Sequence, residues 1–504
     1  MSTIQHTAAS TSHETGKKPP AEAASHRGAA PKRQFLLDAA AHVADTGHRT
    51  FVNSALGGYY KSRDAQKARY RDWEHARDAA SLAKWTAVNR LDELLEQFTS
   101  RFEAHGGTVH WAANAEEARS IILGLVRKAD AKAIIKSKCM TSEEIHLNAA
   151  LEEEGYGVVE SDLGEFIQQL RGEPPYHFVF PCMHVRRDEI STLFHDNLGS
   201  EPTDSPEELT MIARRHMRQL YVNADVGITG ANFLVAETGQ ISITENEGNA
   251  RLTAALPKMH IALAGIEKVV ANLDDLSVLL PMLATAGAGQ PMTCYNTLYS
   301  GPRQEGECDG PEEMHLVLLD NHRSAILADP EQRDSLHCIR CGACLNVCPI
   351  FKNVGGFTYG TTYQGPIGSV ITPHLRGLAD WNHLSGASSL CGACSDACPV
   401  RIDIHHHLLH NRRNAARTAP NWLEKIGHRL FVVVASRPWL FRIAGWIARH
   451  TMGLVRRLKP PLVREWLASR DLPSPPAESF RTAWRRRQQA AAGAASSHRS
   501  QQRP

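Results

Sequence analysis

Two groups of cysteines carry the strongest chemical signal in the chain. The first group is spaced C-x2-C-x2-C-x3-C-P, with Cys338, Cys341, Cys344 and Cys348 ahead of Pro349. This spacing is typical of bacterial chains that hold iron–sulfur clusters through cysteine thiolates. The two-residue steps let successive thiolates point at one cluster. The longer step, ended by proline, turns the fourth thiolate toward a second cluster.

The second group repeats the latter part of this spacing. It reads C-x2-C-x3-C-P, with Cys391, Cys394 and Cys398 ahead of Pro399. In two-cluster ferredoxins each run lends its last cysteine to the other cluster, so we expect two 4Fe–4S clusters here. The expected ligands are Cys338, Cys341, Cys344 and Cys398 for the first cluster, and Cys348, Cys391 and Cys394 for three corners of the second.

The fourth ligand of the second cluster is not defined by the spacing. The full ferredoxin pattern would place an eighth cysteine at position 388, where this chain has Ser388. The Ser388 oxygen could bind iron, Cys294 or Cys308 could reach the site, or the corner could stay open. The sequence leaves these alternatives open.

Zinc is the main alternative to iron–sulfur. Four-cysteine zinc sites also use C-x2-C pairs. A zinc site needs only four ligands, however, and does not require three cysteines at two-residue steps followed by C-P. Seven cysteines in two such runs therefore favour iron–sulfur clusters.

Composition narrows the class of protein further. The 504 residues are 42% hydrophobic, with a formal net charge of +2 and 11 cysteines. This length allows two or three domains, and the near-neutral charge argues against a nucleic-acid partner. Thiolate-bound clusters suit a reducing cytosol, and the polar N-terminus lacks the apolar segment of a secretory signal. No run of 18 apolar residues predicts a membrane span.

The N-terminal part is expected to be a tail followed by helices. We expect residues 1–34 to be disordered and residues 35–107 to be helical. The helices are predicted over Gln34–Ala44, Arg63–Lys84 and Asn89–Glu103. In the last, Leu91, Leu94, Leu95 and Phe98 recur at helical spacing, which indicates a packing face rather than a cofactor contact.

Residues 108–328 have the pattern of an α/β domain with a largely parallel sheet. Short apolar runs alternate with helix-like stretches there. The runs are Val109–Ala112, Ala133–Ile135, Val158–Val159, Phe178–Phe180, Val226–Thr229, Phe233–Ala236, Ile241–Ile243, Lys258–Leu263 and Leu316–Leu319. Thr141 and Ser205, each followed three residues later by glutamate, predict capping boxes at two helix starts.

The C-terminal part divides into three segments. Residues 329–403 form the expected two-cluster module, residues 404–472 a basic helical domain, and residues 473–504 a disordered tail. Apolar stretches at Leu430–Val434 and Trp439–Ile447 are interrupted by arginines. Amphipathic helices of this kind could lie on a membrane or a partner, although an exposed helical hairpin would look the same.

Four other stretches could form sites. Residues 227–233 are rich in small residues and could bring backbone N–H groups to a phosphate or carboxylate, or simply form a tight turn. Residues 246–251 form a polar knot after a strand, where open α/β sheets bind ligands, although a solvated loop would look the same. Residues 136–139 could hold an anion, with Cys139 expected to be a buried apolar residue. Residues 405–407 are three histidines, which cannot easily share one ion from one helix and are expected to be surface or packing residues.

No residues carry a recognisable catalytic motif. The chain has no G-x-S-x-G elbow, no H-E-x-x-H and no dinucleotide or P-loop pattern. We therefore expect no catalytic residues. Iron–sulfur clusters without a visible two-electron centre indicate an electron relay.

Several long motifs together resemble one family. They are the stretch from Lys136 to Ile190 beginning KSKCMTSEEIHLNAALEEEGYG, ITGANFLVAETG at 228–239, NEGNAR at 246–251 and SSLCGACSDACPVRIDI at 388–404. With these, the chain resembles the LutB family of lactate-utilisation iron–sulfur proteins over roughly residues 35–470. Serine at position 388 is also what the family shows. The family usually has KSKSM where this chain has Cys139, which argues against a special role for that thiol.

The resemblance implies a fold, cofactors and partners. The middle of the chain would be a LUD domain, similar in fold to sugar-phosphate isomerase and CoA-transferase-like α/β proteins. The module would carry two 4Fe–4S clusters. The family acts with two sister proteins, a cysteine-rich iron–sulfur subunit and a second LUD protein, in oxidising L-lactate to pyruvate.

These features together predict an electron-transfer subunit of a cytoplasmic L-lactate-oxidising complex. Peripheral contact with the inner face of the membrane would come from the basic C-terminal helices, and the acceptor could be a quinone. One alternative is a metabolite-binding redox sensor or regulator. Another is an electron-transfer subunit for a different 2-hydroxy acid, such as glycolate.

Overall fold

The computed structural model describes residues 31–418, 422–458, 464, 467, 474 and 476–500. The chain divides into two compact units, residues 1–418 and 419–504. Each unit is described by itself. Residues 1–30, most of the predicted N-terminal tail, lie outside the described residues.

Four helices open the first unit. They are α2 (Pro31–Ala44), α3 (Thr46–Lys67), α4 (Trp73–Asn89) and α5 (Leu91–Ala104). Because α2 begins at Pro31, the last residues of the predicted tail are helical. The single helix predicted over 63–84 is wrong: residues 68–72 separate α3 from α4, and Asp72 caps α4 by accepting a hydrogen bond from the His75 N–H. A capping aspartate stops one helix and starts the next, which an even spread of helix formers hides.

The predicted packing face on α5 is confirmed. Leu91, Leu94, Leu95 and Phe98 are all buried, in one cluster with the strand residue Leu316. Burying this stripe against the sheet stabilises the fold by the ordinary hydrophobic effect.

A six-stranded parallel sheet forms the centre of the α/β domain, as predicted. Its order is β1-β10-β7-β4-β2-β3, and every neighbouring pair is parallel. The strands are β1 (Thr108–Ala112), β10 (Glu313–Leu319), β7 (Met259–Gly265), β4 (Val226–Gly230), β2 (Ala133–Lys136) and β3 (Gly157–Glu160). Every residue of β7 is buried, as expected for a central strand covered on both faces.

Helices on both sides of the sheet carry the crossovers between its strands. They include α6 (Ala115–Lys128), α8 (Leu147–Glu153), α9 (Leu163–Arg171), α10 (Arg187–Leu198), α11 (Pro206–Asn223), α12 (Asn249–Ala255) and α13 (Leu273–Ala288). Parallel neighbours require such connections because a tight turn can join only antiparallel strands.

A second sheet of four strands lies in the same domain. Its order is β8 (Val269–Val270), β5 (Phe233–Val235), β6 (Gln240–Glu245) and β9 (Tyr295–Tyr299). The sequence pattern did not predict β8 or β9, which are short or mostly exposed. The antiparallel β5–β6 pair is joined by a turn that ends at Gly239, whose φ of 68° favours glycine.

The strand predicted over Phe178–Phe180 is wrong. Those residues form an irregular segment in which the His177 Nδ1 accepts the backbone N–H groups of Val179 at 3.0 Å and Phe180 at 3.2 Å. Phe178 is apolar because it packs in the cluster that contains the cysteine residues. A short apolar run cannot distinguish a strand from a buried loop.

One of the two predicted capping boxes is confirmed only as an N-cap, because the Ser205 N–H donates to the Thr203 hydroxyl and the Glu208 carboxylate accepts from that hydroxyl instead. Ser205 caps α11 and accepts a hydrogen bond from the Glu208 N–H. The box at Thr141 is wrong: α7 (Met140–Glu144) is capped by Cys139, whose sulfur accepts the Ser142 N–H. Glu144, whose carboxylate was expected to complete that box, pairs with the buried Arg323 instead.

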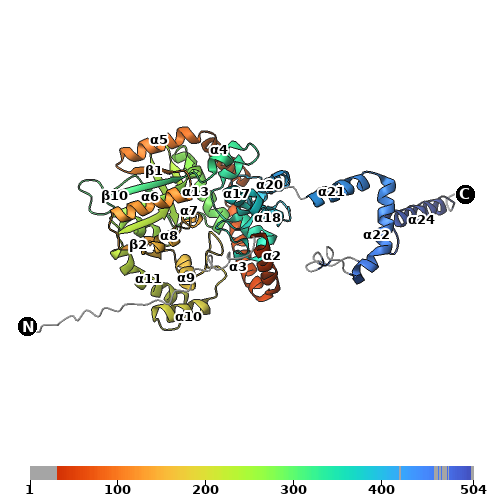
Figure 1. Cartoon of the computed structure of the whole chain (residues 1–504), viewed down its shortest axis with the longest axis horizontal. Coiled ribbons are helices and arrows are strands. Elements are labelled where there is room, and N and C mark those ends of the chain that lie inside the picture. The colour runs from red at the N-terminus through yellow and green to blue at the C-terminus, as the bar shows by residue number, and fades with distance from the viewer. Residues whose placement is uncertain are drawn as a thin grey trace, which may run out of the picture. The chain divides into compact units, whose positions relative to one another are not determined.

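The cysteine module follows the α/β domain and is built of short helices. They are α15 (Ala343–Val347), α16 (Pro349–Val354), α17 (Gly365–Arg376), α18 (Leu378–Gly386), α19 (Ala393–Ala397) and α20 (Ile404–Thr418). The N-terminal helices α2 and α3 pack on α15, α16 and α18, so segments about 300 residues apart lie side by side. Figure 1 shows this as red helices against teal ones. The N-terminal segment therefore serves as the outer wall of the cysteine module.

The second unit contains three described helices, α21 (Trp422–Ala435), α22 (Pro438–Leu458) and α24 (Phe480–Ser500). Helix α24 lies where disorder was predicted, and its alanines, glutamines and arginines are strong helix formers. Among the described residues no single helix is long and apolar enough to cross a membrane. The pair Lys425–Ala435 and Pro438–Leu458 passes that test together, with a bend of 111° between them.

Candidate functional site

The first cysteine run folds into a tight loop that leads into α15. Arg340 and Gly342 both have positive φ angles, 61° and 78°, so the chain turns sharply between Cys341 and its neighbours. A side chain at Gly342 would meet Val179 at 2.8 Å, which only glycine avoids. This turn gives the two-residue spacing its curled shape.

The structure brings the four predicted ligands of the first cluster around one small cavity. Cys338, Cys341 and Cys344 line it together with Cys398, from the end of the second run. The remaining walls are apolar, including Phe178. A thiolate cage with a dry surround is what a 4Fe–4S cluster requires, so these residues fit the group.

Burial and neighbouring thiols raise the pKa values of three cysteines in this cavity, Cys341, Cys344 and Cys398. Burial, and after it the neighbouring Cys398, raises the pKa of Cys341. Burial, and then Cys338 and Cys341, does the same for Cys344, and the pKa of Cys398 reaches about 12 mainly through burial. Four sulfurs this close together, on three buried cysteines and the partly buried Cys338, are stable as thiolates only beside a cation, which cluster iron supplies.

The three predicted ligands of the second cluster form a second cysteine set, which is more exposed to solvent than the first. Cys348 and Cys394 are buried and Cys391 is exposed. Burial, followed by the neighbouring Cys348 and Cys391, raises the pKa of Cys394 to about 11. Cys394 also acts on the pKa of Cys344, which belongs to the first set. The two sets therefore adjoin each other.

Backbone amides point at the sulfurs. The Ile402 N–H donates to Cys398 Sγ at 3.3 Å, and the Phe351 N–H donates to Cys348 Sγ at 3.5 Å. Each bond follows from the C-P sequence, because proline starts the turn that aims the later amide back at the cysteine. Hydrogen bonds to cluster sulfurs raise the reduction potential of a cluster.

Ser388 is engaged with the backbone. Its hydroxyl accepts the Leu390 N–H at 3.1 Å, and its carbonyl accepts a bond from Arg412 at 2.7 Å. Among the described contacts, none joins Cys294 or Cys308 to the second set. The Cys294 N–H instead donates to Asn246, and Cys308 lies in the exposed turn between β9 and β10.

Buried charges connect the first cysteine loop to the α/β domain. Glu267 accepts bonds from Arg323 at 2.6 Å and from Arg340 at 3.2 Å, and Arg323 also pairs with Glu144. Burial opposes the charge of Glu267, but the two arginines hold its pKa at about 2. The buried Lys84 ammonium donates to the Glu267 carbonyl at 2.6 Å.

This charge group places cations near Cys338. Burial lowers the pKa values of Lys84 and Lys268 to about 8, and the Cys338 thiolate acts in the opposite direction on both. Sequence reasoning missed the group because its members come from five separate segments. The one available signal was Arg340, an arginine inside a C-x2-C step.

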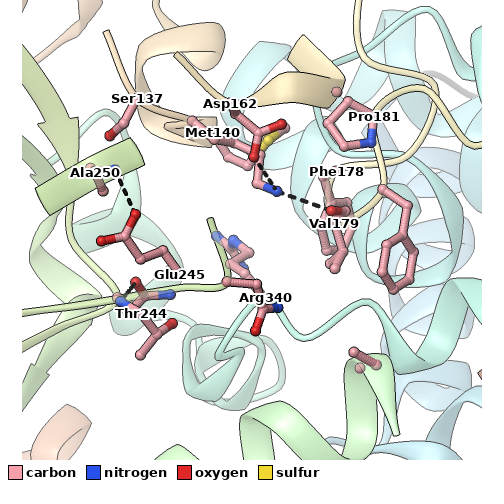
Figure 2. A pocket seen from close by; sticks show the side chains of 18 of the residues that line it. Ser137, Met140, Asp162, Phe178, Val179, Pro181, Thr244, Glu245, Ala250 and Arg340 are labelled. Atoms are coloured by element: carbon pink, nitrogen blue, oxygen red, sulfur yellow. Dashed lines mark hydrogen bonds and ion pairs between the residues drawn. The ribbon is translucent and has the colours of Figure 1, made fainter. Parts of the chain in front are cut away.

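A pocket of about 530 Å³ lies between the α/β domain and the first cysteine loop. Figure 2 shows Asp162, Glu245 and Arg340 arranged around it. The polar knot predicted over residues 246–251 lies in this wall, where Asn246, Glu247 and Asn249 line the pocket. Cys341 lines the opposite part, so the pocket reaches the first cysteine set.

The remaining predicted sites have mixed outcomes. Residues 227–230 belong to β4, residues 231–232 connect it to β5, which begins at Phe233, and Asn232 lines the pocket. Cys139 is buried, as predicted. Lys136 is not free to hold an anion, because Glu160 and Glu143 pair with it at 2.8 and 3.1 Å.

The three histidines separate. His407 is buried and its Nδ1 lies 3.1 Å from Gln332, whereas His405 and His406 both approach Asp403. The prediction that the three do not share one ion agrees with this divergence. Asp403, His405 and His406 do converge, which the sequence did not suggest.

Comparison with known proteins agrees with this architecture. The family description "LUD domain" matches residues 95–319, "4Fe-4S dicluster domain" matches residues 334–402, and "Lactate utilisation protein B, C-terminal" matches residues 405–489. The fold and the cysteine site therefore define an iron–sulfur protein that carries two 4Fe–4S clusters beside a LUD domain.

Full-length relatives specify the family. Lactate utilization protein B of Oceanobacillus iheyensis is 43% identical over 448 residues, covering 87% of this chain and 93% of the relative. That of Shouchella clausii is 42% identical over 450 residues, covering 87% and 94%. "Uncharacterized electron transport protein YkgF" of Escherichia coli is 41% identical over 422 residues, covering 82% and 89%. The chain belongs to the lactate utilisation protein B family.

Proposed function

We propose that the protein is the iron–sulfur electron-transfer subunit of a complex that oxidises L-lactate to pyruvate. The observation that carries the proposal is the adjacency of two cysteine sets: α15, which carries Cys344, packs against α19, which carries Cys394. Bound 4Fe–4S clusters accept and release single electrons. Sulfur sets that adjoin each other keep the hopping distance short.

The proposed ligands follow the swapped pattern. They are Cys338, Cys341, Cys344 and Cys398 for the first cluster, and Cys348, Cys391 and Cys394 for the second. Supporting this assignment, the first four surround one cavity, and among the other three burial and, after it, the neighbouring Cys391 raise the pKa values of both Cys348 and Cys394. The chain's own contribution is to hold the thiolates, to donate amides to them and to keep water out.

The proposed partners are the two sister lactate-utilisation proteins, a cysteine-rich iron–sulfur subunit and a second LUD protein. The relatives' name, lactate utilization protein B, supports a multi-protein pathway. The exposed position of Cys391 supports an exchange of electrons with a partner at the second set. Electrons then enter or leave where the protein surface is nearest to the thiolates.

We place the protein in the cytoplasm, with peripheral contact at the inner membrane face through α22. Within its own unit, α22 exposes an apolar stripe at helical spacing, made up of Trp439, Ile443, Trp446, Ile447 and Leu454. Arg442, Arg449 and Arg456 lie off this stripe by the same spacing. An amphipathic helix with arginines on its polar side binds the surface of an anionic bilayer, which would bring the chain to a membrane-borne acceptor.

Anaerobic reconstitution tests the function. The loaded chain and its two sister proteins are mixed with L-lactate, and dye reduction and the EPR signals of both clusters are followed. We expect lactate to reduce the clusters within the turnover time. Clusters that keep their oxidation state throughout turnover would instead support the redox-sensing alternative, and faster turnover of glycolate than of L-lactate would reassign the substrate.

A further inference from the structure

The pocket beside the first cysteine set contains two cations that keep hydrogen-bond donors without a partner. Lys268 is only 8% exposed, and in the part of the chain that the structure describes no hydrogen bond or ion pair involves its ammonium. Arg340 uses Nη2 to bind Glu267, but its buried Nη1 has no hydrogen-bond partner. Both side chains line the pocket.

The third cation of the pocket is different. The Lys138 ammonium lies 3.5 Å from the Asp162 carboxylate and donates to the Val179 carbonyl at 3.0 Å, as the dashed lines in Figure 2 show. Its charge is therefore already balanced. Lys138 provides an internal comparison for Lys268.

The acidic groups of the pocket are also satisfied. Glu245 accepts the Ala250 and Arg251 N–H groups at 2.6 and 2.9 Å, at the start of α12. Glu247 accepts the Leu163 N–H at 3.0 Å, and Asp162 pairs with the lysine described above. Among the described charged side chains that line the pocket, the donors left without a partner therefore belong to Lys268 and Arg340.

Buried donors without partners are costly, so they indicate a ligand that accepts hydrogen bonds. The free Nη1 of Arg340 can donate a charge-assisted hydrogen bond to one carboxylate oxygen, and a nearby ammonium adds a point charge. We propose that this pocket binds a small organic carboxylate, of the 2-hydroxy or 2-oxo acid class, on Arg340 and Lys268 beside Cys341. The choice of acid rests on the proposed function, whereas the carboxylate itself rests on the pocket.

An anion bound in this pocket should affect the reduction of the first cluster. Arg340 lies between two of the proposed ligands, Cys338 and Cys341, so a bound anion sits close to the first cluster. Negative charge near a cluster disfavours its reduced form. By thermodynamic reciprocity, the oxidised protein should bind the carboxylate more tightly than the reduced protein. The pocket would therefore bind the acid more tightly when the first cluster is oxidised and able to accept an electron.

Calorimetric titration of the anaerobically loaded full chain tests the proposal. L-lactate and pyruvate are compared with L-lactamide, which has the shape of lactate but no charge. We expect saturable binding of the acids, none of lactamide, and a lower midpoint potential of the first cluster with acid present. Equal binding of acid and amide, or no acid binding up to tens of millimolar, would overturn the proposal.

Matched variants assign the effect to the pocket. We expect K268M to weaken acid binding at least tenfold, K268R to retain it, and K138M to change it less than threefold. Each variant is used only with wild-type iron content and circular dichroism, and K268R shows that charge is what matters. Unchanged binding in K268M, or equal losses in K268M and K138M, would rule out this site.

The experiments can refute the pocket proposal and the proposed electron-transfer function independently of each other. Loss of acid binding to the isolated chain would remove the pocket proposal, yet lactate could still reduce the clusters through the sister proteins. Conversely, clusters that lactate never reduces would remove the electron-transfer function while acid binding to the pocket still stands.

Discussion

The guanidinium of Arg77, on α4, donates through Nε to the backbone carbonyl of Cys398 at 3.0 Å. The same side chain donates to the Ser395 carbonyl at 3.2 Å and pairs with Glu74 at 2.8 Å. Through these bonds Arg77 connects the N-terminal segment to the second cysteine run, where Cys398 lies 321 residues away in sequence. It also places a positive charge beside the thiolate of Cys398.

Removing this charge should lower the reduction potential of the first cluster. We expect Arg77→Met to lower it by roughly 60 mV, since a loss of about 1.4 kcal/mol corresponds to that shift in a one-electron couple. EPR-monitored redox titration measures the shift. Arg90→Met, at a half-exposed arginine that pairs with Glu93, is the matched control and should leave the potential unchanged.

Removing one thiolate of the first set should remove one cluster. Cys341 is buried in the four-cysteine cavity, so Cys341→Ala should lower the iron content from about eight atoms to about four and stop lactate-dependent electron flow. Iron and sulfide analysis on anaerobic protein measures the content. Cys308→Ala, in an exposed turn, serves as the control and should keep all the iron. An unchanged iron count in the Cys341 variant would overturn the assignment.

Disrupting the buried charge group should destabilise the first unit. Glu267 pairs with Arg323 and Arg340, so Glu267→Gln leaves the buried Arg340 without its carboxylate partner and Arg323 with Glu144 alone. We expect a loss on the order of 3 kcal/mol, measured as a fall of several degrees in the apparent melting temperature. The control Glu93→Gln breaks an exposed pair and should cost less than about 1 kcal/mol. Similar melting temperatures for both variants would contradict this role.

Acid binding in the pocket should weaken as the pH rises. Burial, and after it the neighbouring Asp162, raises the pKa of Glu247 to about 7, with Lys138 and Glu245 also facing it. Glu247 is neutral below that pH and negative above it, whereas a small carboxylic acid stays ionised on both sides. We expect the affinity to fall roughly threefold to tenfold between pH 6 and pH 8. The Glu247→Gln variant should lose the fall centred near pH 7 and keep only the decline toward pH 8 that loss of the Lys268 charge produces, because the pKa of Lys268 is about 8. A slope identical to that of the wild type would rule out Glu247.

The apolar stripe of α22 should mediate membrane contact. Replacing Ile443 and Trp446 with serine removes two exposed members of the stripe, so sedimentation with anionic phospholipid vesicles should fall strongly. Phe441→Ser, equally exposed but off the stripe by helical spacing, should bind as the wild type does. Binding that is lost equally in both, or that persists with neutral vesicles and in high salt, would argue against this surface.

Local signals in the sequence predicted the cysteine chemistry and most of the parallel strands. Thiolate spacing is a short-range property, because a few residues of chain decide whether successive sulfurs can face one cluster. Alternation of apolar runs with helices likewise predicted the sheet that contains β7. The same reasoning failed at Phe178–Phe180, since an apolar run is equally suited to packing against the cysteine core as a loop.

The pairing of distant segments depended on the tertiary structure alone. The contact of Arg77 with Cys398, the sharing of Glu267 by Arg323 and Arg340, and the unmatched Lys268 in a pocket beside Cys341 each join residues that no periodicity connects. Whether a charged residue is solvated, paired or left open to a ligand depends on what folds around it. The sequence determined which atoms can bind iron, and the tertiary structure decided which charges surround them.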